Sequence, residues 1–298
     1  MTFASVSFVP ASFLSGYDAG FQNLVHIWLN LAAFVVIVTF IVSELTRNYS
    51  QVDKLWSLMP IAYSWITASL FPSSRMFLMA ALVTVWGLRL SFNFYRKGGY
   101  NIIPWKGEED YRWKILRETP ALKGRLRFGL FNLLFISFYQ NLLILLFCTP
   151  LLLAALYPGT GFAVTDIAAA ALMLLFITTE TVADNQMYKF QKGKRRQVEQ
   201  DTTGSDSPEK GFLTEGLWKY VRHPNYASEQ AIWISFYLFG VAASGKWINF
   251  TLAGPVLLVI LFIGSSVMTE KVSSSKYPDY SVYKKEVPKF IPRIFRRR

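Results

Sequence analysis

The sequence is poor in the residues from which soluble redox and metal proteins build their sites. It contains one cysteine, Cys148, and two histidines, His26 and His223. A single cysteine within an apolar run excludes a disulfide framework and a cysteine metal cluster, and two distant histidines argue against a histidine-rich metal site. We therefore predict no metal. A GxGxxG pattern is also absent, so a Rossmann module is not expected to bind a dinucleotide here.

Charged residues are scarce as well, at 17% of the chain, whereas soluble proteins carry roughly a quarter. Apolar residues make up 52% and occur in blocks of about twenty, the length that crosses a bilayer. The start of the chain lacks the basic residues and cleavage site of a secretory signal, so we expect the first block to be retained. These features predict an all-α, polytopic integral membrane protein with a single membrane domain over residues 1–298.

The apolar blocks predict about seven transmembrane helices, at residues 24–44, 52–71, 76–95, 128–156, 164–186, 224–244 and 249–270. The net charge of +12 comes mainly from three segments, 96–127, 189–222 and the tail from residue 271. With seven spans all three lie on one side, so the positive-inside rule places the C-terminus in the cytoplasm and the N-terminus outside. Basic residues in loops on the cytoplasmic side therefore account for the positive net charge, and we expect no nucleic acid partner.

The rest of the chain is arranged around residues 216–240, where a basic, polar entrance turns at a proline into a long apolar helix. Arg222, His223 and Asn225 gather at the mouth of this helix, and Glu229 lies a turn deeper. This pattern predicts a pocket for a polar, anionic ligand. The alternative is an interfacial anchor, in which Arg222 and neighbouring tyrosines such as Tyr226 lie at headgroup level.

Several ionisable residues occur where a bilayer makes charge costly, so each needs a role. Asp53 opens the second span, either as a functional acid or as an acid that complements the helix dipole. Arg89 lies in the third span and can snorkel to the interface. Glu180 and Asp184 share one helical face above a cluster of lysines. They either line a binding site or end a helix in water.

Further polar residues lie in the fourth span and in the tail. Gln140 and Asn141 either join helices by hydrogen bonds or reach a substrate. Glu270 closes the seventh span, and three tyrosines beyond it recur at the spacing of one helical face: Tyr277, Tyr280 and Tyr283. An amphipathic surface helix explains these tyrosines as well as a ligand does. Apart from Gln140, Asn141 and Arg89, the polar groups lie at the basic ends of spans and predict one cavity open to the cytosol. A soluble nucleotide cofactor is expected to enter from the cytosol and a lipid from the bilayer.

Five stretches together resemble one known family. They are VDKLWS (52–57), WGLRLS (86–91), ETVADNQMYKF (180–190), GLWKYVRHPNYASEQ (216–230) and KYPDYSVYKKEVPKFIPRIF (276–295). In order and spacing they resemble the membrane steroid 5α-reductase family (3-oxo-5-alpha-steroid 4-dehydrogenase-like), and within it a bacterial branch of uncharacterised members, over about residues 50–298. Sterol C14-reductases and isoprenylcysteine carboxyl methyltransferases carry similar RHPNY segments. The resemblance implies seven helices around NADPH, hydride transfer to an enone, and a bacterial inner membrane location.

Carried over by position, the resemblance implies that Asn225 and Glu229 belong to the cofactor-binding segment, Asp184 to the fifth-span motif and Tyr277 to the tail. Asp53 stands where the family has a catalytic glutamate. The chain departs from the family before this residue, where a valine replaces glutamine, and in the seventh span, where GSSVMTEK replaces a basic, histidine-rich segment. These departures leave the steroid substrate and the mode of phosphate binding open.

The predicted chemistry is reduction of a C=C bond by NADPH. Asp53 is the predicted acid, because a carboxyl kept protonated by an apolar site can donate a hydrogen bond to a carbonyl oxygen. Tyr95 and Tyr139 are further catalytic candidates. The cofactor phosphates need cations or N–H donors, and Lys194 and Arg195 add to those available. The predicted cofactor-binding residues are Asp184, Asn185, Lys192, Arg222, His223, Asn225, Tyr226, Glu229, Glu270, Tyr277 and Tyr280.

Two other classes stay open. An S-adenosylmethionine-dependent methyltransferase of a membrane substrate would need fewer cations, because its cofactor carries no phosphate. A transporter or structural membrane protein would typically show paired repeats and broken helices, and the sequence has no evident repeat. The predicted partners are a lipophilic small-molecule substrate from the bilayer and membrane lipids, with no obligate protein partner.

Overall fold

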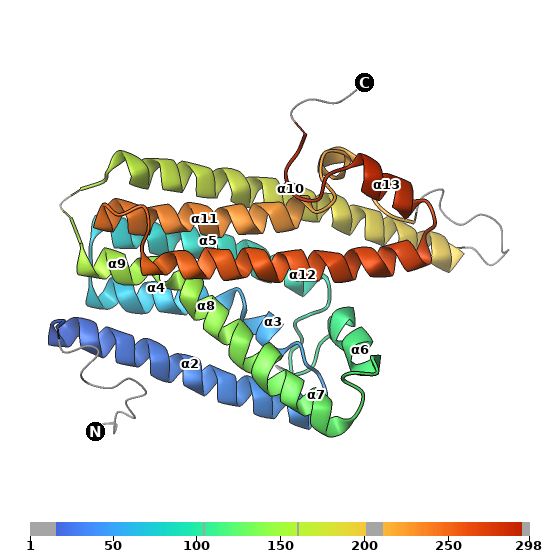
Figure 1. Ribbon diagram of the computed structural model, residues 1–298, viewed down its shortest axis with the longest axis horizontal. Coiled ribbons are helices and arrows are strands. Elements are labelled where there is room, and N and C mark those ends of the chain that lie inside the picture. The colour runs from blue at the N-terminus through green and yellow to red at the C-terminus, as the bar shows by residue number, and fades with distance from the viewer. Residues whose placement is uncertain (1–15, 104, 160, 201–210, 294–298) are drawn as a thin grey trace. The chain divides into compact units, whose positions relative to one another are not determined.

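The computed structural model describes residues 16–103, 105–159, 161–200 and 211–293, with side chains to residue 197 in the third range. The chain is 76% helical, and these described ranges contain no strand, which confirms the all-α prediction. Along the chain (Figure 1) the helices are α2 (Ala19–Thr46), α3 (Gln51–Leu55), α4 (Leu58–Leu70), α5 (Ser74–Arg96), α6 (Tyr111–Glu118), α7 (Arg125–Phe131), η1 (Asn132–Tyr139), α8 (Gln140–Cys148), α9 (Pro150–Leu156), α10 (Val164–Gln200), η2 (Gly216–Lys219), α11 (Pro224–Ser244), η3 (Phe250–Leu252), α12 (Ala253–Lys276) and α13 (Tyr280–Glu286).

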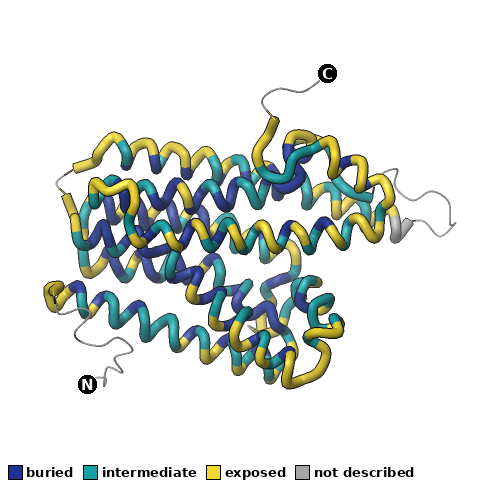
Figure 2. The backbone as a smooth tube through the Cα atoms, in the orientation of Figure 1, coloured by how far each residue is buried: buried dark blue, intermediate teal, exposed yellow. Residues whose placement is uncertain are grey.

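Five helical stretches are long and apolar enough to cross a membrane: Ala19–Thr46, Ser74–Arg96, Arg125–Leu156, Val164–Gln197 and Phe250–Lys276. They place the protein in the integral membrane class. The two remaining expected spans coincide with α4, which has 13 residues, and α11, which has 21. Seven spans and their orientation therefore stay predictions. In Figure 2 the long helices alternate between buried and exposed residues along their length, while the turns between them are mostly exposed.

The predicted second span, 52–71, is divided in the structure. Helix α3 ends at Leu55 and α4 begins at Leu58, with a turn between them. Asp53 therefore lies in the first turn of a five-residue helix that precedes α4, outside the five candidate spans.

The described chain divides into two compact units. One comprises residues 1–170 and 236–257, and the other comprises residues 171–235 and 258–298. The prediction of a single domain over 1–298 is a statement about the membrane region as a whole and stays a prediction.

The first unit is built on the helical hairpin of α4 and α5, which pack closely along their length. A Cβ atom at Gly87 would lie 2.6 Å from the carbonyl oxygen of Ser57 and 2.7 Å from Cδ1 of Ile61. The hydroxyls of Ser57 and Ser91 lie 2.7 Å apart across the same contact. Small residues that let backbones approach are typical of packed membrane helices.

A buried ion pair joins two helix starts in this unit. Nε and Nη2 of Arg75 donate to the two carboxylate oxygens of Asp166 at 2.8 and 2.9 Å, and neither residue is more than 5% exposed. Arg75 also donates to the carbonyl oxygen of Tyr157 at 3.1 Å. The pair thereby fixes the start of α5 to the start of α10.

The long stretch from α7 to α9 contains a π-helix, η1. A π-helix leaves polar side chains and backbone groups in unusual register and often occurs at functional places. Around it, Nδ2 of Asn141 donates to the carbonyl oxygen of Ser137 at 2.7 Å and to Oγ1 of Thr39 on α2 at 3.4 Å. Nδ2 of Asn132 donates to Glu44 at 2.9 Å. Asn141 thus joins two helices, which was one of its two predicted roles.

In the second unit the tail returns to the start of α11. The backbone N–H groups of Arg222 and His223 donate to the carbonyl oxygens of Pro288 and Lys289, at 2.9 and 3.1 Å. Three tail tyrosines surround the ring of Phe212, with ring centroids 5.9, 5.0 and 5.4 Å away: Tyr277, Tyr280 and Tyr283. The last two are buried on α13, so the tail helix is amphipathic as one of the two interpretations expected.

Candidate functional site

The first unit places Asp53 against helix α6, a contact that the sequence does not indicate. Nε1 of Trp113 donates to Oδ2 of Asp53 at 2.9 Å. The indole is 5% exposed, and the Asp53 carboxyl is half-buried beneath it. A buried indole N–H normally finds a hydrogen-bond partner, and here that partner is the predicted acid.

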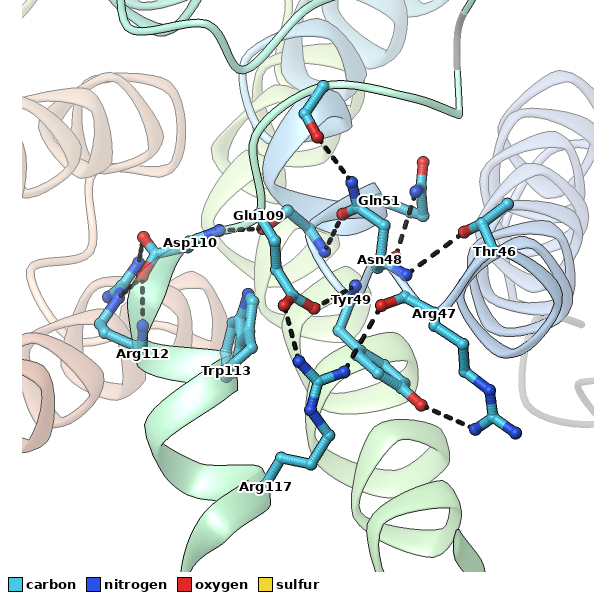
Figure 3. Close-up of polar contacts among 12 residues, drawn as sticks. Thr46, Arg47, Asn48, Tyr49, Gln51, Glu109, Asp110, Arg112, Trp113 and Arg117 are labelled. Atoms are coloured by element: carbon cyan, nitrogen blue, oxygen red, sulfur yellow. Dashed lines mark hydrogen bonds and ion pairs between the residues drawn. The ribbon is translucent and has the colours of Figure 1, made fainter.

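A second carboxylate, Asp110, lies close enough to Asp53 to act on it electrostatically. Asp110 caps α6 by accepting from the backbone N–H of Arg112 at 2.9 Å. The Arg112 guanidinium also binds both of its oxygens, at 2.9 and 2.8 Å. Figure 3 shows Arg112 folded back onto Asp110, with Trp113 beside them. A bidentate arginine of this kind holds a carboxylate in its ionised form.

The surroundings of the two carboxyls move their pKa values in opposite directions. Burial and the neighbouring Asp110 charge raise the pKa of Asp53, against the opposing effects of Arg112, Trp113 and Ser50. Burial also opposes ionisation of Asp110, but Arg112 outweighs it and lowers the Asp110 pKa below its ordinary value. Adjacent carboxyls whose pKa values are pushed apart are a common arrangement for an acid that donates a proton or hydrogen bond near neutral pH.

The segment before α3 is fastened to the loop before α6 by several contacts. Glu109 accepts from the backbone N–H of Tyr49 and from Arg117, both at 2.9 Å (Figure 3). Nδ2 of Asn48 donates to the carbonyl oxygen of Gly107 at 2.9 Å. Nζ of Lys54 donates to the carbonyl oxygen of Lys106 at 2.8 Å. These contacts hold Asp53 and Trp113 in fixed register even though 60 residues separate them.

The two tyrosines predicted as further catalytic groups are placed differently. Tyr95 lies near the end of α5 with 64% of its surface exposed. Tyr139 ends η1 and is half-buried, with its ring stacked on Phe135 at a centroid distance of 5.4 Å. Within the described residues, neither is among the groups in contact with Asp53. Their catalytic role stays a prediction.

In the second unit the structure brings two of the residues predicted to bind the cofactor into contact, and a third lies one turn further along α11. Nδ2 of Asn225 lies 3.4 Å from Oδ1 of Asp184, which joins the start of α11 to α10. Glu229, one turn deeper, accepts from Nε1 of Trp233 at 3.1 Å. Asp184 and Glu229 are buried. Among the described residues, Oδ1 of Asn225 is buried without a hydrogen-bond partner.

Arg222, His223 and Glu270 form a separate buried network in this unit. Oε1 of Glu270 accepts from Nε of Arg222 at 2.9 Å and lies 3.0 Å from Nε2 of His223. Nη1 of Arg222 also donates to the carbonyl oxygens of Lys284, at 2.9 Å, and Val287. These contacts use much of the guanidinium to hold the tail, so an anion at Arg222 would have to share it with Glu270.

The remaining predicted residues lie around these two groups. The Tyr226 ring is stacked on His223 at a centroid distance of 5.3 Å. Nζ of Lys194 donates to the hydroxyl of Tyr277 and to the carbonyl oxygen of Gly211. Tyr280 packs on Phe212 and is buried. Asn185 and Lys192 are exposed along α10.

These side chains fit a dinucleotide in chemical type. A buried amide oxygen without a donor is costly, and a ribose hydroxyl or a carboxamide N–H would satisfy it. Exposed cations on the same helix can pair with phosphate groups: Lys192, Arg195 and Arg196. Over the described part of the chain, no group of three or more His, Cys, Asp or Glu side chains is arranged to hold a metal ion.

Sequence reasoning missed the α6 residues that contact Asp53. The segment 96–127 was interpreted only as a basic loop, yet it contains GEEDYRW, a group of acids and aromatic residues within a run of lysines and arginines. That local change of composition could have marked the segment as more than a basic loop. It does not indicate which distant residue the Trp113 indole binds.

Comparison with known proteins finds similarity over most of the chain. The profile of a family described as "Protein of unknown function (DUF1295)" matches residues 39–287. An uncharacterised protein of the yeast Schizosaccharomyces pombe is 36% identical over 296 residues, covering 92% of this chain and 84% of that protein. Because this relative comes from yeast, it gives no support to the predicted bacterial inner membrane.

Proposed function

Because the chain belongs to the DUF1295 family, which lies in the steroid 5α-reductase-like superfamily, we propose that it is a membrane-embedded, NADPH-dependent reductase of an enone C=C bond. The observation that supports this proposal is the Asp53 carboxyl, which is half-buried and bound by an indole N–H, with burial and the neighbouring Asp110 charge raising its pKa. An acid of this kind suits the stabilisation of charge on a carbonyl oxygen.

The roles of the residues follow from this chemistry. Bound NADPH would supply the hydride. Asp53 would donate a hydrogen bond to the substrate carbonyl oxygen and so stabilise the enolate that hydride addition to the β-carbon produces. A proton from water would then add to the α-carbon and complete the reduction. Asn225 accepts a hydrogen bond from the cofactor through its buried Oδ1. Asp184 and Glu229 orient that amide and its surroundings, and the exposed cations of α10 pair with phosphate.

We further propose that the substrate is a lipophilic molecule drawn from the bilayer. Five apolar helices long enough to span a membrane support a lateral route for such a molecule. Steroid, polyprenyl and fatty enones all satisfy this chemistry.

The first test is a binding titration on detergent-purified protein with NADPH and S-adenosylmethionine side by side. We expect saturable NADPH binding and no binding of S-adenosylmethionine, followed by loss of nicotinamide absorbance with one member of an enone panel. Binding of S-adenosylmethionine alone would replace the reductase with a methyltransferase. Binding of neither would remove the nucleotide site and favour a non-enzymatic or transport function.

Replacing the acid tests its role. With an enone substrate in hand, Asp53→Asn is expected to lower kcat by roughly 10²–10³-fold, because the amide is a much weaker hydrogen-bond donor to a developing oxyanion. NADPH affinity should stay unchanged. Unaltered turnover in Asp53→Asn would show that this carboxyl is not the acid.

A further inference from the structure

We propose that Trp113 and Asp110 are positioning residues for Asp53: Trp113 fixes the orientation of the carboxyl group, and Asp110, held by Arg112, keeps that group in its proton-bearing form. The functional meaning of this inference rests on the proposed role of Asp53 in reduction. The arrangement itself can be tested without a substrate.

The hydrogen bond from Trp113 indicates which oxygen carries the proton. An indole N–H is only a donor, so the oxygen it binds must offer a lone pair. In a neutral carboxylic acid the better acceptor is the carbonyl oxygen, and Trp113 binds Oδ2. In the protonated form of Asp53 the acidic hydrogen is therefore expected on Oδ1, which leaves that oxygen as the one that can donate to a ligand.

Burial and the charges around Asp53 favour its protonated form over its ionised form. Asp110 contributes a negative charge, and the bidentate contact with Arg112 keeps it ionised. Lys97 and Arg112 are cations that interact with Asp110, so their positive charges partly offset the effect of its negative charge on the pKa of Asp53. Lys54, adjacent to Asp53, favours the ionised form, but burial lowers its own pKa and its ammonium is bound to the Lys106 carbonyl.

Two substitutions are expected to shift the titration of Asp53 in opposite directions. Asp110→Asn removes the negative neighbour and frees Arg112, so the pKa of Asp53 should fall, by about 1 pH unit or more for a charge at this range. Trp113→Phe removes a hydrogen bond that favours the carboxylate, so the pKa of Asp53 should rise. Asparagine can still cap α6, and phenylalanine keeps most of the buried ring.

Infrared spectroscopy of the full-length protein in detergent measures this directly. The C=O stretch of a protonated carboxyl is followed against pH, and the Asp53→Asn variant identifies the band that belongs to Asp53. In Trp113→Phe the band should also move to higher frequency, because its carbonyl oxygen loses a donor. Trp105→Phe is the matched control, since the Trp105 side chain is 51% exposed in the same loop and its contact with Gln51 uses only the backbone carbonyl.

The possible outcomes separate this inference from the proposed function. Opposite shifts in the two variants, with Trp105→Phe unchanged, support the positioning roles whether or not an enone is ever reduced. Equal titration of wild type, Trp113→Phe and Asp110→Asn would overturn them, as would shifts of the same sign, which a general loosening of the loop would produce. If the infrared shifts occur while no NADPH binds, the local arrangement stands and the reductase proposal fails.

Discussion

At the scale of single residues, the amide of Asn225 has only part of its hydrogen-bonding capacity in use. Its Nδ2 points to Asp184, while Oδ1 is buried without a donor among the described residues. A buried acceptor left in this state costs about 1–3 kcal/mol. A ligand that supplies the missing donor regains part of that energy on binding, which makes Asn225 the sharpest single-residue test of the nucleotide site.

We expect Asn225→Ala to weaken NADPH binding by about tenfold, which corresponds to one hydrogen bond of roughly 1.4 kcal/mol. Fluorescence or calorimetric titration of purified protein measures the change. Asn23→Ala, at an exposed asparagine on α2, is the control and should bind NADPH like wild type. Undiminished affinity in Asn225→Ala would remove this residue from the cofactor site.

Some contacts of the candidate site could be predicted from the sequence, and others could not. Asn225 and Glu229 lie one helical turn apart in the motif at the start of α11, whereas the family resemblance added Asp184 from another span. The structure brings Asn225 and Asp184 into contact. The contact of Asp53 with Trp113 could not be predicted, because it joins residues 60 positions apart through a loop without periodic pattern. Side-chain contacts across long loops depend on tertiary packing, which periodicity does not reveal.

At the scale of elements, close helix packing depends on individual glycines. A Cβ at Gly87 would meet the backbone oxygen of Ser57, an atom that cannot rotate away, whereas a Cβ at Gly264 in α12 would meet nothing within 4 Å among the described atoms. Both residues lie inside helices, so the helix propensity gained by alanine is similar at the two positions.

We therefore expect Gly87→Ala to destabilise the protein by about 1–3 kcal/mol through overpacking of α4 against α5. Gly264→Ala should leave stability unchanged or raise it by up to about 1 kcal/mol. Thermal melts of the two variants in the same detergent make the comparison. Equal melting temperatures would show that α4 and α5 separate without difficulty and that this contact is not a stability determinant.

The sequence predicted helices along most of the chain, but it did not predict where a helix breaks or changes type. Long apolar blocks predict helices, and these cover the five candidate spans. The division of the second span between α3 and α4 and the π-helical turn of η1 do not interrupt the apolar pattern, so composition alone continues a helix through them.

At the scale of the whole molecule, the single stretch Arg125–Leu156 decides how two loops lie relative to a bilayer. It joins the loop that ends before Arg125 to the turn at residues 157–163 and is long enough to cross once. A single crossing would place the two loops on opposite sides, whether the chain has five spans or seven. The positive-inside rule then predicts that the first of them, rich in lysine and arginine, faces the cytoplasm.

Cysteine labelling tests this topology. The single native cysteine is first replaced by Cys148→Ser, and Ile102→Cys or Phe162→Cys is then added, at residues that are 100% and 50% exposed. In intact cells a membrane-impermeant maleimide should label Phe162→Cys and spare Ile102→Cys until the membrane is opened. Labelling of both sites before opening would contradict the single crossing, and labelling of Ile102→Cys alone would reverse the predicted orientation.

The Arg75–Asp166 pair has a consequence for the order of events in biosynthesis. The two residues are 91 positions apart, and elongation proceeds at about 5–20 residues per second. Roughly 5–18 seconds therefore pass between the synthesis of Arg75 and the synthesis of its counter-ion, Asp166. Arg75 lacks its carboxylate partner during that interval, so the contact between the starts of α5 and α10 forms only after the start of α10 has been made.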